Sequence, residues 1–313
     1  MIRYILQRFV GMIVVMAVVV TVVFVIVRVA PGDPASVMLG PDATAQDVAA
    51  LRARLGLDRP LPVQYALFVG QLLRGDLGHS IFLNMPVLSA LADRAEPTFF
   101  LTLFSIAIAS AIAIPVGILS AYKRGSPFDQ ATTTDAMLAA SVPSFRLGLL
   151  LIQTFAERYG VFPVSGYGGP GASLATRLHH LVLPAVALGI VSSALILRFT
   201  RASMLDVLND DYIRTARSKG MGEFRVVMKH AFKNALIPIL TVLGLTAALL
   251  VSGAVVTETV YGVPGVGSLV VSAVLRRDYP VIQGALLVVA ALYVIINFLI
   301  DMLYLVVDPR VRY

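Results

Sequence analysis

The sequence contains no cysteine and has little charge. Among its 313 residues, 14% are Asp, Glu, Lys or Arg, whereas 58% are hydrophobic. Without cysteine the chain forms no disulfide and has neither a thiol nucleophile nor a cysteine-based metal site. Because a soluble domain has about 25% charged residues, the composition excludes an ordinary soluble protein.

Long apolar runs account for this composition. A helix needs about 20 mostly apolar residues to cross a membrane, and spans must be helical because lipid cannot satisfy unpaired backbone groups. The first run is longer than a signal-peptide core of about 7–15 residues, so we interpret it as a retained span. The sequence predicts an all-α integral membrane protein with six transmembrane helices, at residues 10–30, 98–122, 132–155, 181–199, 235–257 and 281–307.

The basic residues gather on one side of these spans. Lys and Arg close to span ends mark cytoplasmic loops, and they are dense at both termini and in the loop 200–234. We therefore expect both termini and this loop to face the cytoplasm. The same distribution explains the net charge of +7 without contact with nucleic acid.

The loop 31–97 is too long for a simple connection, because loops over about 12–15 residues usually have a role. Two of its stretches, 43–55 and 63–73, have helical spacing of apolar residues and end near Gly56 and Gly75. We expect a small extracytoplasmic lid that touches a partner; a mere connector is the alternative. The predicted organisation is the N-terminus and first span at 1–30, the lid at 31–97, and a core of five spans at 98–313.

The cytoplasmic loop 200–234 is the densest polar segment of the chain. Asp210 and Asp211 suit the N-terminus of a helix, where the helix dipole favours acid. Arg217 and Lys219 occupy the last turn, and Gly220 suits the left-handed residue that follows many helices. These signals predict a helix at 212–219. Because so short a helix is marginal in water, we expect it to pack against something.

Two surfaces of this loop favour different partners. Arg225, Lys229 and Lys233 form a basic stripe at four-residue spacing, which favours membrane lipid headgroups over a protein partner. The helix at 212–219 has too few large apolar side chains for a membrane anchor, so its composition favours a protein groove.

The segment 211–220 closely resembles part of a known family. It reads Asp-Tyr-Ile-Arg-Thr-Ala-Arg-Ser-Lys-Gly and is followed by His230, Asn234 and Pro238. It is similar to the peptide-uptake branch of ATP-binding cassette (ABC) importer permeases, which serve dipeptide, oligopeptide, glutathione and nickel import. Further motifs of this branch occur in order along the whole chain, at residues 31–34, 55–60, 75–78, 123–129, 163–166, 258–267, 277–280 and 308–310.

The resemblance implies a type I ABC importer permease fold in the bacterial inner membrane. It implies a non-catalytic chain that forms half of a translocation pathway for di- or oligopeptides and binds no cofactor itself. The implied partners are a second, homologous permease, two ATPase subunits that bind ATP and Mg²⁺, and an extracytoplasmic substrate-binding protein. The helix in the cytoplasmic loop corresponds to the coupling helix, which implies ATPase contact for Asp211, Tyr212, Arg214, Thr215, Ala216, Arg217, Lys219, Gly220 and Glu223.

No constellation of catalytic or metal-binding residues is visible. The sequence has neither a phosphate-binding G-x-x-x-x-G-K-[ST] loop nor an H-E-x-x-H motif, and the serines of the spans lack a nearby His and Asp. A self-powered secondary transporter or channel is the alternative function. It is disfavoured because no internal repeat is evident and mid-span charge is scarce. Short peptides are the preferred substrate, with glutathione or a nickel complex as alternatives.

Several residues in or beside the spans are pathway candidates. Arg146 is a charge at membrane depth, where function is the default hypothesis. Pro143, between Ser141 and Ser144, should kink the third span, and broken helices often border cavities in transporters.

Two further expectations concern the ends of the spans. Gly265 and Gly267 predict a re-entrant turn and a short helix whose N-terminal dipole points at the outer opening, as a gate. Asp135 and Asp301 are expected to form ion pairs at the cytoplasmic rim, with Lys123, Arg124 or Arg310 as partners.

Overall fold

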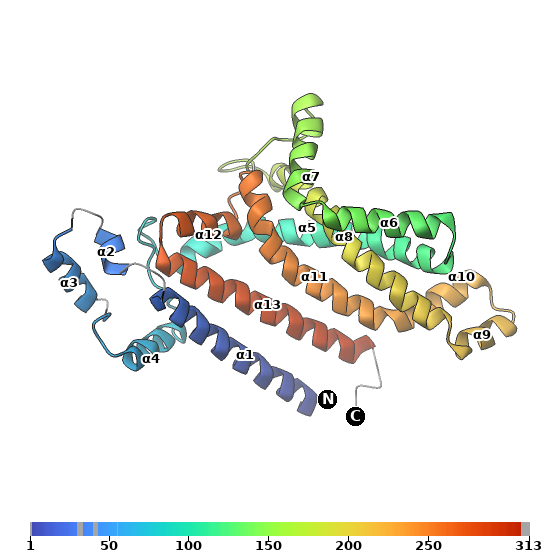
Figure 1. Cartoon of the computed structure of the whole chain (residues 1–313), viewed down its shortest axis with the longest axis horizontal. Coiled ribbons are helices and arrows are strands. Elements are labelled where there is room, and N and C mark those ends of the chain that lie inside the picture. The colour runs from blue at the N-terminus through green and yellow to red at the C-terminus, as the bar shows by residue number, and fades with distance from the viewer. Residues whose placement is uncertain (1, 30–33, 40–42, 55, 308–313) are drawn as a thin grey trace.

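The structure, a computed structural model, describes residues 2–29, 34–39, 43–54 and 56–307. In this part of the chain, five helical stretches are long and apolar enough to cross a membrane. They lie side by side along the long axis of the molecule (Figure 1), which confirms the all-α membrane architecture. Their helices are α1 (Ile2–Val29), α5 (Val87–Tyr122), α8 (Leu174–Leu208), α11 (Phe232–Val260) and α13 (Tyr279–Val307). The short helix α10 (Glu223–Arg225) and the π-helix η2 (Val226–Ala231) lead into α11.

Glycines allow the central helices to pack closely. A Cβ atom on Gly117 of α5 would lie 2.8 Å from the Cβ of Thr200, and one on Gly189 of α8 would lie 2.9 Å from the Cβ of Ile108. Small residues let membrane helices approach in this way. The helix α11 packs beside α8, and α13 packs beside α1 and α11.

The two ends of the molecule carry different short elements. The helices α9 (Asp211–Ser218) and α10 lie at one end, whereas α2 (Pro34–Leu39), α3 (Ala45–Arg54), α4 (Leu61–Leu72) and α12 (Val266–Leu275) lie towards the other (Figure 1). The predicted cytoplasmic loop and the predicted lid are therefore separated by the length of the helical bundle.

The lid contains the two predicted helices, as α3 and α4, and an additional helix, α2. The predicted helix-ending glycines, Gly56 and Gly75, have positive φ angles of 65° and 75°. Aromatic contacts hold α4 to α1, because the ring of Phe24 lies 5.2 Å from that of Tyr65 and 5.6 Å from that of Phe68. The motifs at 31–34 and 308–310 lie mostly or wholly outside the described residues.

The third predicted span is not one kinked helix. It is divided into α6 (Pro127–Ser141) and α7 (Ser144–Leu151), which continues as the π-helix η1 (Ile152–Arg158), and the two halves are bent by 95°. Because the residue before a proline is disfavoured in the α conformation, Val142 is extended, with φ −90° and ψ 122°. The helix therefore ends before Pro143 and starts again after it, and α7 projects from the bundle (Figure 1). Taken as one broken span, the pair brings the number to six within the described residues.

Asp301 forms an ion pair as predicted, but its partner is neither Lys123 nor Arg124. Its carboxylate lies 3.1 Å from the Nη2 atom of Arg8, because α1 packs beside α13. Asp135 is exposed and forms no ion pair within the described part of the chain. Arg310 lies outside the described residues.

Candidate functional site

The helix α9 forms where the sequence predicts it, shifted by one residue. Asp210 is the N-cap residue in an extended conformation, although its side chain makes no capping hydrogen bond. Asp211 lies in the first turn and Arg217 in the last, which suits the helix dipole. Gly220 has a φ of 77°, so the chain reverses there at a position that favours glycine.

One face of α9 is buried against the helical bundle. Ile213 is fully buried and Ala216 is 8% exposed, and both belong to an apolar cluster with Met204 of α8 and Val226 of η2. Ala216 was predicted to contact the ATPase, and the apolar side chains of the helix were expected to suit a partner's groove. Ile213 and Ala216, at i, i+3 spacing on one face, instead pack into the protein's own core.

Polar contacts fix the orientation of α9. The Nη2 atom of Arg217 lies 2.7 Å from Oε1 of Glu223, and this carboxylate holds the pKa of Arg217 above its ordinary value. At the other end, the side-chain amide of Asn234 donates a 2.7 Å hydrogen bond to the hydroxyl of Tyr212. The two ends of α9 are thus tied to α10 and to the first turn of α11.

The remaining predicted coupling residues point away from the bundle. Asp211, Arg214, Thr215, Lys219 and Gly220 are all exposed. Beside them, Phe224 of α10 is 81% exposed, although aromatic side chains are usually well buried. The outer face of α9 therefore offers charges of both signs and an adjacent aromatic ring.

A groove lies between α8 and α11 at the point where α6 gives way to α7. Its volume is about 300 Å³, and its walls include Ser144, Ser192, Leu195, Arg198 and Thr246. Of the predicted pathway residues, Ser144 lies on this groove. Ser141, Pro143 and Arg146 are exposed and do not line it, and the Ser141 hydroxyl donates to the carbonyl of Met137.

The predicted turn and short helix around Gly265 and Gly267 are present, but the N-terminus of α12 does not face an opening. It faces the carboxylate of Glu258, which is fully buried. This carboxylate accepts hydrogen bonds from the Thr98 hydroxyl at 2.6 Å and the Ser268 backbone N–H at 2.9 Å. An acidic group at a helix N-terminus is stabilised by the helix dipole, so the α12 dipole acts on Glu258. The gate role of Gly265 and Gly267 stays a prediction.

Comparisons with known proteins agree with this arrangement of spans and loops. Residues 113–313 match a family described as the inner membrane component of binding-protein-dependent transport systems, and residues 1–102 match the N-terminal part of such components. The chain belongs to this family of ABC importer permeases.

Three curated relatives align with nearly the whole permease. A probable peptide ABC transporter permease of Sinorhizobium fredii is 46% identical, over 99% of each chain. A glutathione transport system permease of Pectobacterium atrosepticum is 42% identical and a dipeptide transport system permease of Alkalihalophilus pseudofirmus is 40% identical, each over 100% of both chains. The inward-facing MetNI methionine ABC transporter shares the fold, with a TM-score of 0.60 and 18% identity over 70% of this chain and 96% of that one.

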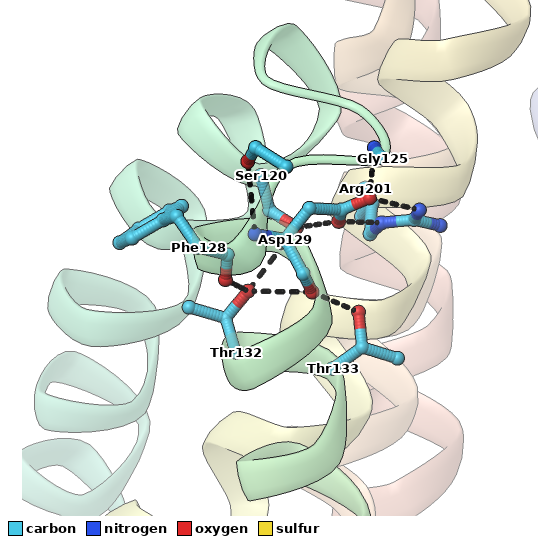
Figure 2. Close-up of polar contacts among 8 residues, drawn as sticks. Ser120, Gly125, Phe128, Asp129, Thr132, Thr133 and Arg201 are labelled. Carbon is cyan, nitrogen blue, oxygen red and sulfur yellow. Dashed lines mark hydrogen bonds and ion pairs between the residues drawn. The ribbon is translucent and has the colours of Figure 1, made fainter.

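The permease also contains an ion pair that sequence reasoning did not find. The guanidinium of Arg201 on α8 holds the carboxylate of Asp129 on α6 in two hydrogen bonds, of 2.6 Å from Nε and 2.8 Å from Nη2 (Figure 2). The Ser120 hydroxyl and the Gly125 backbone N–H also donate to this carboxylate. Asp129 appeared in the sequence only within the motif 123–129, and 72 residues separate it from Arg201, so nothing local indicated the pair.

Proposed function

We propose that this ABC importer permease carries short peptides into the cell. The support for this cargo is the set of relatives at 40–46% identity, whose names specify peptides, dipeptides and glutathione, itself a tripeptide. The described residues contain no group of three or more His, Asp or Glu placed to hold a metal ion. The names of these relatives favour a peptide over a nickel complex as the cargo.

The proposed energy input is an ATPase subunit that binds the exposed face of α9. The observation that carries this assignment is the division of α9 into two faces, one buried against α8 and η2 and one exposed. Because interiors are close-packed, a push on the exposed face passes through Ile213 into the bundle. The ties at Tyr212 and Arg217 keep α9 from sliding along that surface.

We infer a complete transporter of two permeases, two ATPases and an extracytoplasmic binding protein. In this assembly ATP and Mg²⁺ are bound by the ATPases, and this chain contributes movement rather than catalysis. The α9 end and both termini face the cytoplasm across the inner membrane, and the lid faces the binding protein. The exposed stripe of Arg225, Lys229 and Lys233 contacts anionic lipid headgroups.

The assignment of α9 is tested by purifying the tagged permease with its ATPase subunits. Arg214→Glu reverses a charge on the exposed face of α9, where the side chain is 73% exposed, and should abolish co-purification. Lys229→Glu makes the same charge change on the lipid stripe and should retain the ATPase. Equal recovery of the ATPase by both variants, or equal loss, would contradict the assignment to α9.

A further inference from the structure

The groove between α8 and α11 has the size and composition of a small-ligand site. Leu188, Val191 and Leu195 form one apolar wall on α8, and Leu249 and Leu250 form the other on α11. Its volume of about 300 Å³ is at the lower end of the range for small-molecule sites, about 300–1,000 Å³. Such sites are mostly apolar and contain a few polar groups that fix the orientation of the ligand.

Three hydroxyl groups of the groove are not used by the protein. Serine and threonine in helices commonly bond a carbonyl one turn earlier, as the Ser193 hydroxyl does with Ile190 and the Thr241 hydroxyl with Ile237. In the described part of the chain, no hydrogen bond is formed by the hydroxyls at the groove. These are the hydroxyls of Ser144, Ser192 and Thr246.

Thr246, in the wall of the groove, carries a buried hydroxyl that the described part of the protein leaves unsatisfied. Thr246 is 3% exposed, and its Oγ1 atom has no hydrogen-bond partner among the described residues. A buried hydroxyl without a partner is costly, so this wall of the groove is not optimised for packing alone.

Arg198 supplies the only guanidinium that lines this groove in the described structure. It follows Val191 and Leu195 at helical spacing on the same face of α8, which places it at one end of the groove. Arg198 is exposed and forms no ion pair with any described residue. One turn further along α8, Arg201 by contrast is paired with Asp129. An exposed, unpaired guanidinium beside an apolar wall can accept a carboxylate from outside the chain.

We propose that this groove is a peptide subsite in which Arg198 binds the C-terminal carboxylate of a short peptide. Two parallel hydrogen bonds from a guanidinium match a carboxylate well. The hydroxyls along the groove then bond the peptide backbone, and the leucines contact its side chains. This inference rests on the proposed peptide cargo and goes beyond it, because it assigns the residues that hold the cargo within the spans.

The test uses the complete transporter, with its binding protein and ATPases, in proteoliposomes. Uptake of radiolabelled dialanine is measured against peptide concentration. Arg198→Gln should raise the KM for uptake by about ten- to hundredfold, which is the range expected for a lost charged hydrogen bond. The matched control Arg124→Gln removes an exposed arginine outside the groove and should leave the KM unchanged.

A second pair of variants tests the hydroxyls without changing charge. Ser192→Ala removes a hydroxyl of the groove and should raise the KM by about two- to tenfold. Ser193→Ala removes the neighbouring hydroxyl, which is bonded to Ile190, and should have no effect on the KM. ATP hydrolysis by each complex confirms that the variant is folded and assembled.

The outcomes separate this proposal from the proposed cargo. If the wild-type complex imports no dialanine or other short peptide, the proposed cargo is wrong. If the wild type imports dialanine and Arg198→Gln has the same KM as Arg124→Gln, the subsite is overturned. It is also overturned if the effect of Arg198→Gln depends on anionic lipid in the vesicles, because Arg198 then binds a lipid phosphate.

Discussion

Individual glycines decide how closely α12 and the turn before it approach α11. A Cβ atom on Gly265 would lie 2.2 Å from Cδ of Glu258, and one on Gly267 would lie 2.5 Å from Cα of Val255. The first contact is with the end of a side chain, whereas the second is with backbone, which has little freedom to move. The absence of a side chain at Gly265 and Gly267 thus leaves room for the buried carboxylate of Glu258.

We expect Gly267→Ala to destabilise the permease by about 1–3 kcal/mol, the usual cost of overpacking a core. The change is measured as a lower thermal unfolding temperature of the detergent-solubilised protein. Gly70→Ala is the control, because a Cβ at this helical glycine of α4 meets no atom within 4 Å. Equal unfolding temperatures for Gly267→Ala and the wild type would show that α12 does not pack against α11 as described.

At the scale of elements, the sequence predicted the ends of α9 well but did not predict the angle between α6 and α7. The ends of α9 were predictable to within one residue, because the caps and the helix-ending glycine are local signals. The break at Pro143 was predictable in position but not in angle. Proline ends the helix locally, whereas the direction of α7 depends on its packing against α8 and α11.

The bend between α6 and α7 is measurable by spin labels. The chain has no cysteine, so Gln130→Cys with Leu150→Cys introduces two labels without removing native thiols. A continuous helix would place these positions about 30 Å apart at 1.5 Å per residue, and the 95° bend should reduce this to about 20 Å. The control pair His179→Cys with Phe199→Cys, equally spaced in the continuous helix α8, should give about 30 Å. Equal distances for the two pairs would contradict the bend.

At the scale of the whole molecule, the chain is a set of helices with a lid at one end and α9 at the other (Figure 1). The Asp129–Arg201 pair ties α6 to α8 on the stretch of α8 that leads towards α9. Asp129 has a side chain that is 5% exposed, and its carboxylate is satisfied by four donors (Figure 2). The pair thus connects α6 and α8 at the end of the bundle that carries α9 (Figure 1).

We therefore expect the purified permease, reconstituted alone in liposomes, to accumulate no radiolabelled peptide. Addition of the second permease, the ATPases and the binding protein should give uptake that requires ATP. The measurement is peptide retained in the vesicles with ATP, compared with a non-hydrolysable analogue. Concentrative uptake by the isolated chain would favour the alternative of a self-powered transporter.

The sequence by itself determined the elements of this protein. Long apolar runs dictate spans because lipid satisfies no backbone groups, and caps, glycines and prolines mark helix ends through local backbone chemistry. Motifs spread along the chain also indicated the family.

Only the tertiary structure decided which residues meet. The pairs Asp129 with Arg201 and Glu258 with Thr98 join residues that are 72 and 160 positions apart, and the burial of Ala216 depends on what packs behind α9. Such contacts arise from the packing of whole helices against each other, and no local pattern in the chain specifies them.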